Sequence, residues 1–275
     1  MERISLSDFF PAVRPIVGMV HLLPLPGAPR WGGSMDAVLE RALADAQALV
    51  AGGVDGLLVE NFLDAPFHPE AVPAETTAAM AVVVRAVVRA APAGLGVGVN
   101  VLRNDAAAAL GVAAATGARF IRVNVHTGVM LADQGWLHGR AHETLRLRAR
   151  LGAPVAILAD VLVKHAAPPA PLDPAQVARD TWERGLADGL IVSGTGTGAP
   201  TDRARIRAIK EAVPAAPVWI GSGLTPENAA DLLLAADGSI VGSSLAREGR
   251  AGGGIERARV DRLMEAVRAV RAAGG

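Results

Sequence analysis

The chain has 275 residues, 51% of them apolar, and its 27 basic and 27 acidic residues balance each other. A balanced charge offers no basic surface for a nucleic acid or an anionic membrane. The absence of cysteine excludes disulfides and thiolate metal sites. No apolar run reaches the roughly 20 residues that cross a bilayer, and residues 1–20 lack the apolar segment of a signal peptide. We therefore expect a cytoplasmic protein with no nucleic-acid partner and no membrane span.

Short runs rich in Val, Ile and Leu alternate along the chain with longer segments rich in Ala, Leu and Arg. The short runs predict strands at residues 15–22, 56–61, 96–102, 119–125, 155–162, 189–194, 218–224 and 239–245. The longer segments predict helices at residues 35–51, 74–91, 105–116, 139–151, 174–184, 201–213, 226–234 and 257–273. Proline after a capping residue, at Asp173-Pro174 and Thr225-Pro226, predicts the starts of two of these helices.

This alternation predicts parallel strands, because each helix carries the chain back over the sheet. Eight such units in 275 residues favour a (β/α)8 TIM barrel, which typically takes ~250 residues. We expect residues 1–275 to form this barrel as one domain. A doubly wound open sheet is the competing architecture.

In a barrel of this kind the reactive residues follow the carboxyl ends of the strands. Polar side chains gather at those positions, whereas the opposite loops carry mostly Ala, Gly, Pro and Arg. We interpret two groups as candidate site residues. The candidates for catalysis are Glu60, Asp160 and Lys164, and those for substrate binding are His21, Asn61, Asn100, Asn124, His126, His165 and Ser193.

Two glycine-rich turns follow the seventh and eighth predicted strands, where barrels commonly bind phosphate. Glycine lets the backbone approach a ligand closely, and successive N–H groups in such a turn attract an anion. The predicted phosphate-binding residues are Gly221, Ser222, Gly223, Gly242, Ser243 and Ser244. The alternative is that these glycines only form tight turns between strand and helix. The run at residues 193–198 is either a third wall of the site or a mobile lid.

The carboxylates of Glu60 and Asp160 are candidates for a general acid and base. The alternative for each is an ion pair or a hydrogen bond with a neighbouring amide. Lys164 is a candidate electrophile, phosphate contact or, if its amine is desolvated, Schiff-base lysine.

His21, His126 and His165, together with Asp160, are possible ligands of a divalent metal. Their spacing matches no compact metal motif, so we predict neither a metal nor another cofactor. The long segments 62–73 and 127–136 are expected to be lids or partner surfaces. The run 146–150 and the histidines His138 and His142 are expected to be solvated.

Several of these segments together resemble the BtpA/SgcQ family over about residues 10–270. They are GMVHLLPLPG at 18–27, GVDGLLVEN at 53–61, RVN at 122–124, ADV at 159–161, KH at 164–165 and GSGLTPEN at 221–228. The resemblance implies a barrel of the ribulose-phosphate-binding type. The founding member of the family is described as a factor for the biogenesis or stability of photosystem I. The resemblance carries no established catalytic residues to this chain.

These observations favour an enzyme that acts on a phosphorylated sugar or nucleotide-like molecule, as an isomerase, lyase or aldolase-like catalyst. One alternative is a non-catalytic biogenesis or stability factor of the photosystem I type, and another is a metabolite sensor. We expect a small phosphorylated ligand and a homo-oligomer. Polar residues at six or more strand ends favour the enzyme, because a purely structural barrel has no need of them.

Overall fold

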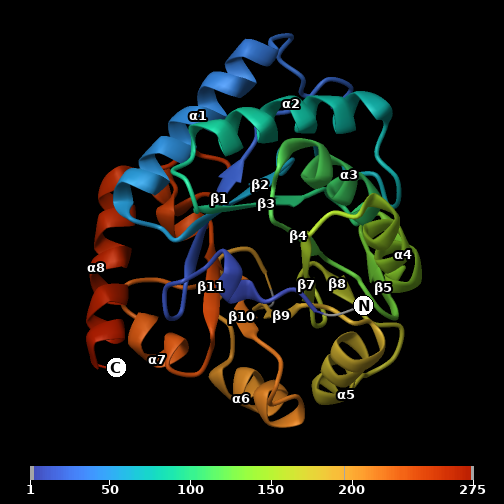
Figure 1. The fold of residues 1–275 in the computed structure, drawn as a ribbon, viewed down its shortest axis with the longest axis vertical. Coiled ribbons are helices and arrows are strands. Elements are labelled where there is room, and N and C mark those ends of the chain that lie inside the picture. The colour runs from blue at the N-terminus through green and yellow to red at the C-terminus, as the bar shows by residue number, and fades with distance from the viewer. Residues whose placement is uncertain (1–2, 195, 274–275) are drawn as a thin grey trace.

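The computed structural model describes residues 3–194 and 196–273, and its central feature is a closed barrel of parallel strands (Figure 1). The strands follow one another around the barrel in the order β1-β11-β10-β9-β7-β4-β3-β2. They are β1 (Ile16–His21), β2 (Gly56–Glu60), β3 (Gly96–Asn100), β4 (Phe120–Val123), β7 (Ala156–Asp160), β9 (Gly189–Val192), β10 (Val218–Ile220) and β11 (Gly238–Val241). The predicted (β/α)8 TIM-barrel fold is therefore confirmed.

Each of the eight predicted helical segments contains a helix, and the helices surround the barrel in Figure 1. They are α1 (Met35–Gly52), α2 (Ala74–Ala90), α3 (Ala106–Thr116), α4 (Ala141–Leu151), α5 (Pro174–Arg179), α6 (Arg203–Ala212), α7 (Ala229–Leu233) and α8 (Arg257–Ala273). A π-helical turn, Asp180–Arg184, continues α5. None of the helices among the described residues is long and apolar enough to cross a membrane.

Helix α7 begins three residues later than the Thr225-Pro226 pair predicts. The Asn228 side chain turns back, accepting the N–H of Thr225 (2.8 Å) and donating to the carbonyl of Gly223 (2.8 Å). These bonds form a closed turn over residues 223–228, so the helix starts at Ala229. The other predicted start is confirmed, because Asp173 accepts the N–H of Ala175 and α5 begins at Pro174.

Aspartates that precede three strands fasten the amino-terminal end of the barrel. Asp55, Asp188 and Asp237 accept N–H groups near the starts of the adjacent strands β1, β7 and β10, at 2.7, 2.8 and 2.8 Å. Asp188 also pairs with Arg148 of α4, and both side chains are buried. The expectation that the whole run 146–150 is solvated is wrong at Arg148, because this arginine balances a carboxylate inside the wall.

Aromatic rings close the same end of the barrel from within. The segment before β1 contains a short 3-10 turn, Leu6–Asp8, followed by Phe9 and Phe10, whose rings pack with those of Phe120 and Trp219. A Cβ atom at Gly56 would lie only 2.5 Å from the Phe10 ring. Glycine in the strand therefore makes room for the ring, and the barrel is packed solid below its mouth.

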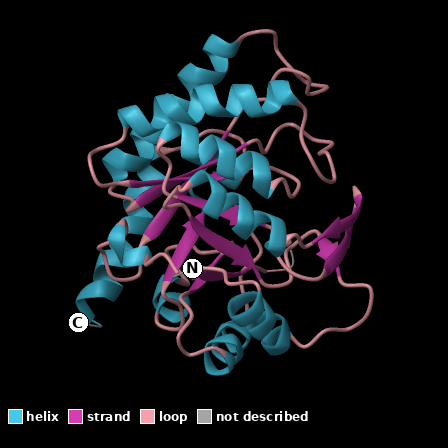
Figure 2. Ribbon diagram, turned by 45° about the vertical axis from the view of Figure 1, so that its right-hand side comes forward, coloured by secondary structure: helices cyan, strands magenta, loops and turns pink. Residues whose placement is uncertain are grey.

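The segment 127–136, predicted as a long loop that serves as a lid or partner surface, belongs to a β-hairpin. Strands β5 (Val129–Ala132) and β6 (Gly135–His138) pair antiparallel, and β8 (Ala166–Ala167) joins β5 from the loop that follows β7. Figure 2 shows this small sheet beside the barrel. A separate apolar cluster that includes Met130 and Leu137 holds it in place. The hairpin delays the start of α4 from the predicted residue 139 to Ala141.

We expect Phe10→Ala to lower the free energy of unfolding by about 3–5 kcal/mol, because it removes a buried ring and leaves a cavity among aromatic side chains. Urea denaturation monitored by circular dichroism measures the change. Val13→Ala is the control, since Val13 is 65% exposed in the same segment and its truncation should change stability by less than about 0.5 kcal/mol. Equal stabilities for the two variants would contradict the conclusion that the buried Phe10 ring stabilises the amino-terminal end of the barrel.

Candidate functional site

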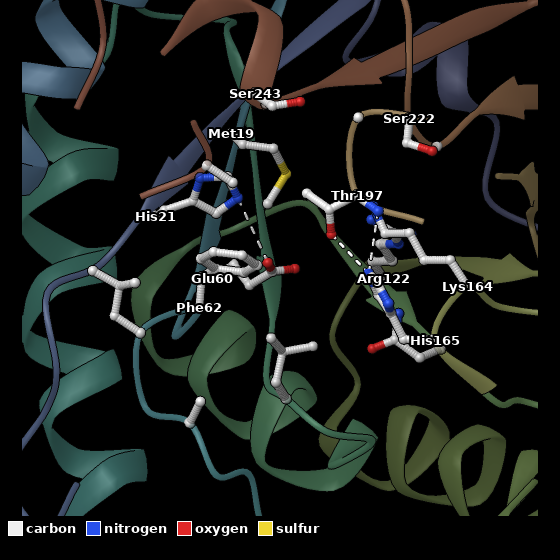
Figure 3. A pocket seen from close by; sticks show the side chains of 18 of the residues that line it. Met19, His21, Glu60, Phe62, Arg122, Lys164, His165, Thr197, Ser222 and Ser243 are labelled. Atoms are coloured by element: carbon white, nitrogen blue, oxygen red, sulfur yellow. Dashed lines mark hydrogen bonds and ion pairs between the residues drawn. The ribbon is translucent and has the colours of Figure 1, made fainter. Parts of the chain in front are cut away.

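A cavity of about 690 Å³ occupies the mouth of the barrel at the carboxyl ends of the strands. Figure 3 shows two facing groups of side chains in it: His21, Glu60 and Phe62 on one side, and Arg122, Lys164 and His165 on the other. The two predicted phosphate turns form a further part of the wall. Those of the predicted site residues that line the cavity are His21, Glu60, Asn124, Lys164, His165, Gly221, Ser222, Gly223, Gly242, Ser243 and Ser244.

The turn after β10 has a backbone that only glycine adopts without strain. Gly223 has a φ of +78°, and a Cβ atom there would lie 2.2 Å from the carbonyl oxygen of Ala199. Among the described residues, the backbone N–H groups of Gly223, Ser243 and Ser244 find no protein acceptor. Unpaired donors at the edge of a cavity form a concave site for an anion.

Side chains behind the two turns hold the backbone in place. Thr201 donates a hydrogen bond to the carbonyl of Ser222 (3.1 Å), and the Ser244 hydroxyl donates to the carbonyl of Leu224 (2.7 Å). The Ser222 hydroxyl accepts the N–H of Gly194 (3.3 Å). The Ser222 and Ser244 hydroxyls are therefore engaged with the backbone. In the described part of the chain the Ser243 hydroxyl has no such partner.

Asp160 forms a two-point ion pair with Arg122 inside the barrel. Its carboxylate oxygens lie 2.9 and 2.8 Å from Nε and Nη2 of Arg122, and both side chains are at most 4% exposed. Burial would lower the pKa of Arg122, but the charge and hydrogen bonds of Asp160 outweigh it and raise that pKa. Asn124 (2.9 Å) and Ser193 (3.4 Å) also donate to Asp160. The carboxylate thus has four donors in the protein and faces Arg122.

Glu60 is buried but has less hydrogen bonding than Asp160. One of its oxygens accepts a hydrogen bond from Asn100 on the adjacent strand, and the other lies 3.7 Å from Nε2 of His21. The other ring nitrogen of His21 accepts the N–H of Gly252 (3.3 Å), which places the ring proton on Nε2. Burial lowers the pKa of His21, so a neutral imidazole faces the Glu60 carboxylate. Phe62 packs on the imidazole with ring centres 4.5 Å apart.

Lys164 enters the cavity from the loop after β7, opposite Glu60. Burial, followed by the positive charge of Arg122, lowers the pKa of its amine from 10.5 to about 8. Arg103 donates a hydrogen bond to the Lys164 carbonyl (2.8 Å) and adds a second guanidinium to the same wall. The exposed His165 contacts Thr197 across the rim at 2.8 Å.

The structure places five predicted site residues away from the cavity surface, and one of them is Asp160, which lies against Arg122. Asn61 bonds Asp64 and the backbone of Leu102 behind the wall. His126 is buried and contacts the carbonyl of Gly185 (2.8 Å) on the outer side of the barrel. Asn100 and Ser193 are covered and act through Glu60 and Asp160.

Sequence reasoning missed two arginines of the mouth, Arg122 and Arg103. Arg122 is the one charged residue in the predicted strand 119–125 after its first position, and such a residue indicates a buried partner. Asn124 also has an unused group, because its buried Oδ1 atom has no partner among the described residues. Within residues 3–194 and 196–273, no three His, Asp or Glu side chains come together to hold a metal ion.

The sequence itself decides the family. A sequence model of the BtpA family matches residues 12–269. The chain belongs to the BtpA family. It is 49% identical to the photosystem I biogenesis protein BtpA of Synechocystis, over 96% of this chain and 91% of that protein. It is 44% identical to an uncharacterized protein of Thermococcus kodakarensis, over 94% and 97% of the two chains.

Solved structures with the same fold are distant in sequence. A thiamine phosphate pyrophosphorylase from Pyrococcus furiosus superposes with a TM-score of 0.61 at 16% identity, covering 97% of this chain and 99% of that one. A phosphoribosyl anthranilate isomerase from Thermus thermophilus gives 0.59 at 13% identity, covering 93% and 99%. At these identities the likeness establishes the barrel fold of this BtpA-family chain and nothing about its chemistry.

We expect Asp160→Asn to lower the free energy of unfolding by about 3–5 kcal/mol, because it leaves the Arg122 charge buried without its counter-ion. Chemical denaturation measures the loss. Asp261→Asn is the matched control, since Asp261 pairs with Arg257 on the exposed face of α8 and its loss should cost under about 1 kcal/mol. An Asp160→Asn variant as stable as the control would show that the buried pair does not stabilise the barrel.

Proposed function

We propose that the barrel mouth binds a phosphorylated small molecule and that the protein is an enzyme of the isomerase or lyase type acting on it. The substrate class is a phosphorylated sugar or a nucleotide-like compound. One observation carries this proposal: a single cavity joins the N–H groups of Gly223 and Ser243, which have no acceptor among the described residues, to the Glu60 carboxylate and to two cations, Arg122 and Lys164.

The phosphoryl group would lie against the turns after β10 and β11. The N–H groups of Gly223, Ser243 and Ser244 supply hydrogen bonds without adding a mobile side chain, and the bonds from Asn228 and Thr201 keep the first turn fixed. A fixed set of donors binds an anion well, because little conformational entropy is lost on binding.

The reacting part of the substrate would then lie deeper, between Glu60 and Arg122. Glu60 is the better general base of the two predicted carboxylates, because Asp160 is committed to its ion pair with Arg122. Arg122 and Lys164 can stabilise the negative oxygen that develops when a proton or a carbon–carbon bond next to a carbonyl is broken.

The space available fits a ligand larger than a triose. A cavity of about 690 Å³ lies within the range of about 300–1,000 Å³ for small-molecule sites. A second, more open hollow of about 750 Å³ continues past Ser243 and Ser244 toward Arg250, Arg259 and Arg262. This continuation supports a substrate with a second part beyond its phosphate, such as a nucleotide-like compound.

A non-catalytic assembly factor is the second candidate function. It is supported by the relative that is 49% identical and bears the name photosystem I biogenesis protein. Leu131 and Trp136, cross-strand partners on the hairpin, are 46% and 51% exposed and offer an apolar contact for another protein or a second copy of this chain. A metabolite sensor would use the same mouth but would leave its ligand unchanged.

We expect ribose 5-phosphate, but not ribose, to raise the melting temperature, since a ligand at one hundred times its dissociation constant adds about 2.7 kcal/mol of stability. Ser243→Asp should abolish the shift by placing a negative charge at the turn. Ser243→Ala should keep it, because the backbone donors remain. Differential scanning fluorimetry makes the comparison, with inorganic phosphate as a competitor. An equal shift for wild type and Ser243→Asp would mean that the phosphate site is misplaced.

We expect Glu60→Gln to lower kcat/KM by about 100- to 10,000-fold while the phosphate-dependent shift persists, because it removes the general base and leaves the turns intact. Phosphorus and proton NMR of phosphorylated sugars incubated with each protein measure turnover. A wild-type protein that binds such ligands without converting them would favour the sensor.

A further inference from the structure

The chain contains only two lysines, and one of them lies in the barrel mouth. Of its 27 basic residues, all except Lys164 and Lys210 are arginines. Lys210 lies on α6 and forms an ion pair with Asp237 at 2.6 Å on the partly exposed outer surface. The two lysines therefore have different surroundings, and the chemical labelling of each can be measured separately in one experiment.

Arginine would be the better residue at position 164 if only a positive charge were needed. A guanidinium remains charged at any physiological pH and binds phosphate through two parallel hydrogen bonds, whereas an ammonium group is a single point charge. Arg122 and Arg103 already supply guanidinium groups to this wall. An amine can do what a guanidinium cannot: lose its proton near neutral pH and attack a carbonyl carbon.

The surroundings of Lys164 favour the neutral amine. In the described part of the chain its nitrogen forms no ion pair with a carboxylate, and Arg122 beside it is already paired with Asp160. Because burial and the nearby guanidinium lower its pKa to about 8, roughly a tenth of the amine is neutral at pH 7. The charged or titratable groups that face it are Arg122, Glu60, Asp160, Arg103, His21, Asp133 and His165.

We infer that Lys164 is a nucleophile that forms an imine with the carbonyl carbon of a phosphorylated aldehyde or ketone bound in the mouth. The inference rests on the proposed phosphate site, which would hold the far end of the ligand. It narrows the substrate class to phosphorylated carbonyl compounds.

The step needs no oxidant or reductant. The lone pair of the amine nitrogen forms the C–N bond, and the carbonyl π electrons move to oxygen, which takes up a proton. The nitrogen loses its protons, the C–O bond breaks, and the hydroxyl group leaves as water after a second protonation. Amine and carbonyl thus give imine and water. Glu60, across the cavity, is the carboxylate placed to carry these protons.

The test is reductive trapping on the full chain. Protein is incubated with glycolaldehyde phosphate or dihydroxyacetone phosphate, reduced with sodium borohydride, digested and mapped by mass spectrometry. The expected product carries the mass of the carbonyl compound less one oxygen atom, on the peptide that contains Lys164. Glycerol phosphate, which has no carbonyl group, should leave the peptide unchanged, and inorganic phosphate should reduce the labelling.

Two variants supply matched controls. Lys164→Arg keeps the charge and should lose labelling at this position while keeping its phosphate-dependent thermal shift. Lys210→Arg should label at Lys164 as strongly as wild type. In the wild-type protein Lys164 labelling should rise with pH around a midpoint near 8, because the neutral amine forms as pH passes its pKa.

The outcomes separate this inference from the proposed function. Labelling of Lys164 no greater than that of Lys210 in the wild-type protein, with the phosphate-dependent shift present, would overturn the imine and leave the phosphate site standing. Selective labelling of Lys164 that inorganic phosphate does not reduce would support the nucleophile and count against the phosphate site. Wild-type peptide mapping decides the first point even if a variant fails to fold.

Discussion

Arg122 of β4 and Asp160 of β7 form a charged pair inside a barrel whose strands are otherwise nearly all apolar. The positions of the neighbouring polar side chains in the barrel mouth depend on this pair. Neither charge is tolerable alone at this depth, because an unpaired buried ion costs several kcal/mol. As a pair they hold each other in place below the cavity, and Asn124 and Ser193 donate further hydrogen bonds to the Asp160 carboxylate. Burial and, after it, the positive charge of Arg122 lower the pKa of Lys164, while Asp160 acts in the opposite direction, so both members of the pair influence the amine.

The two acidic residues at the mouth differ because of what surrounds them. Asp160 receives two guanidinium N–H groups and two further donors, whereas Glu60 has one amide donor and a neutral imidazole nearby. Carboxylates with different surroundings take different roles in an active site. Here the difference assigns a structural role to Asp160, which holds Arg122, and leaves Glu60 as the carboxylate available to a ligand.

The two ends of the barrel are built in opposite ways. At the amino-terminal end, Phe9 and Phe10 pack into the interior, and strand glycines give their rings room. At the other end, glycine allows a backbone conformation with positive φ, and the turn at Gly223 brings its N–H to the cavity surface. The same residue type thus serves dense packing in one place and an anion site in the other, according to what fills the space beside it.

The alternation of apolar and helical segments by itself determined the barrel, because parallel strands joined by helices close in few ways. It also determined that His21, Glu60 and Lys164 meet at one end, since the carboxyl ends of all eight strands share one rim. Local pattern could not show the hairpin at 129–138, whose strands are short and half exposed. Nor could it show which way a side chain turns: Asn61 faces outward although its neighbour Glu60 faces the cavity. Only the tertiary structure decided that Asp160 pairs with Arg122, because these residues are distant in sequence and adjacent in space. It also decided that the Lys164 amine forms no ion pair with a carboxylate among the described residues.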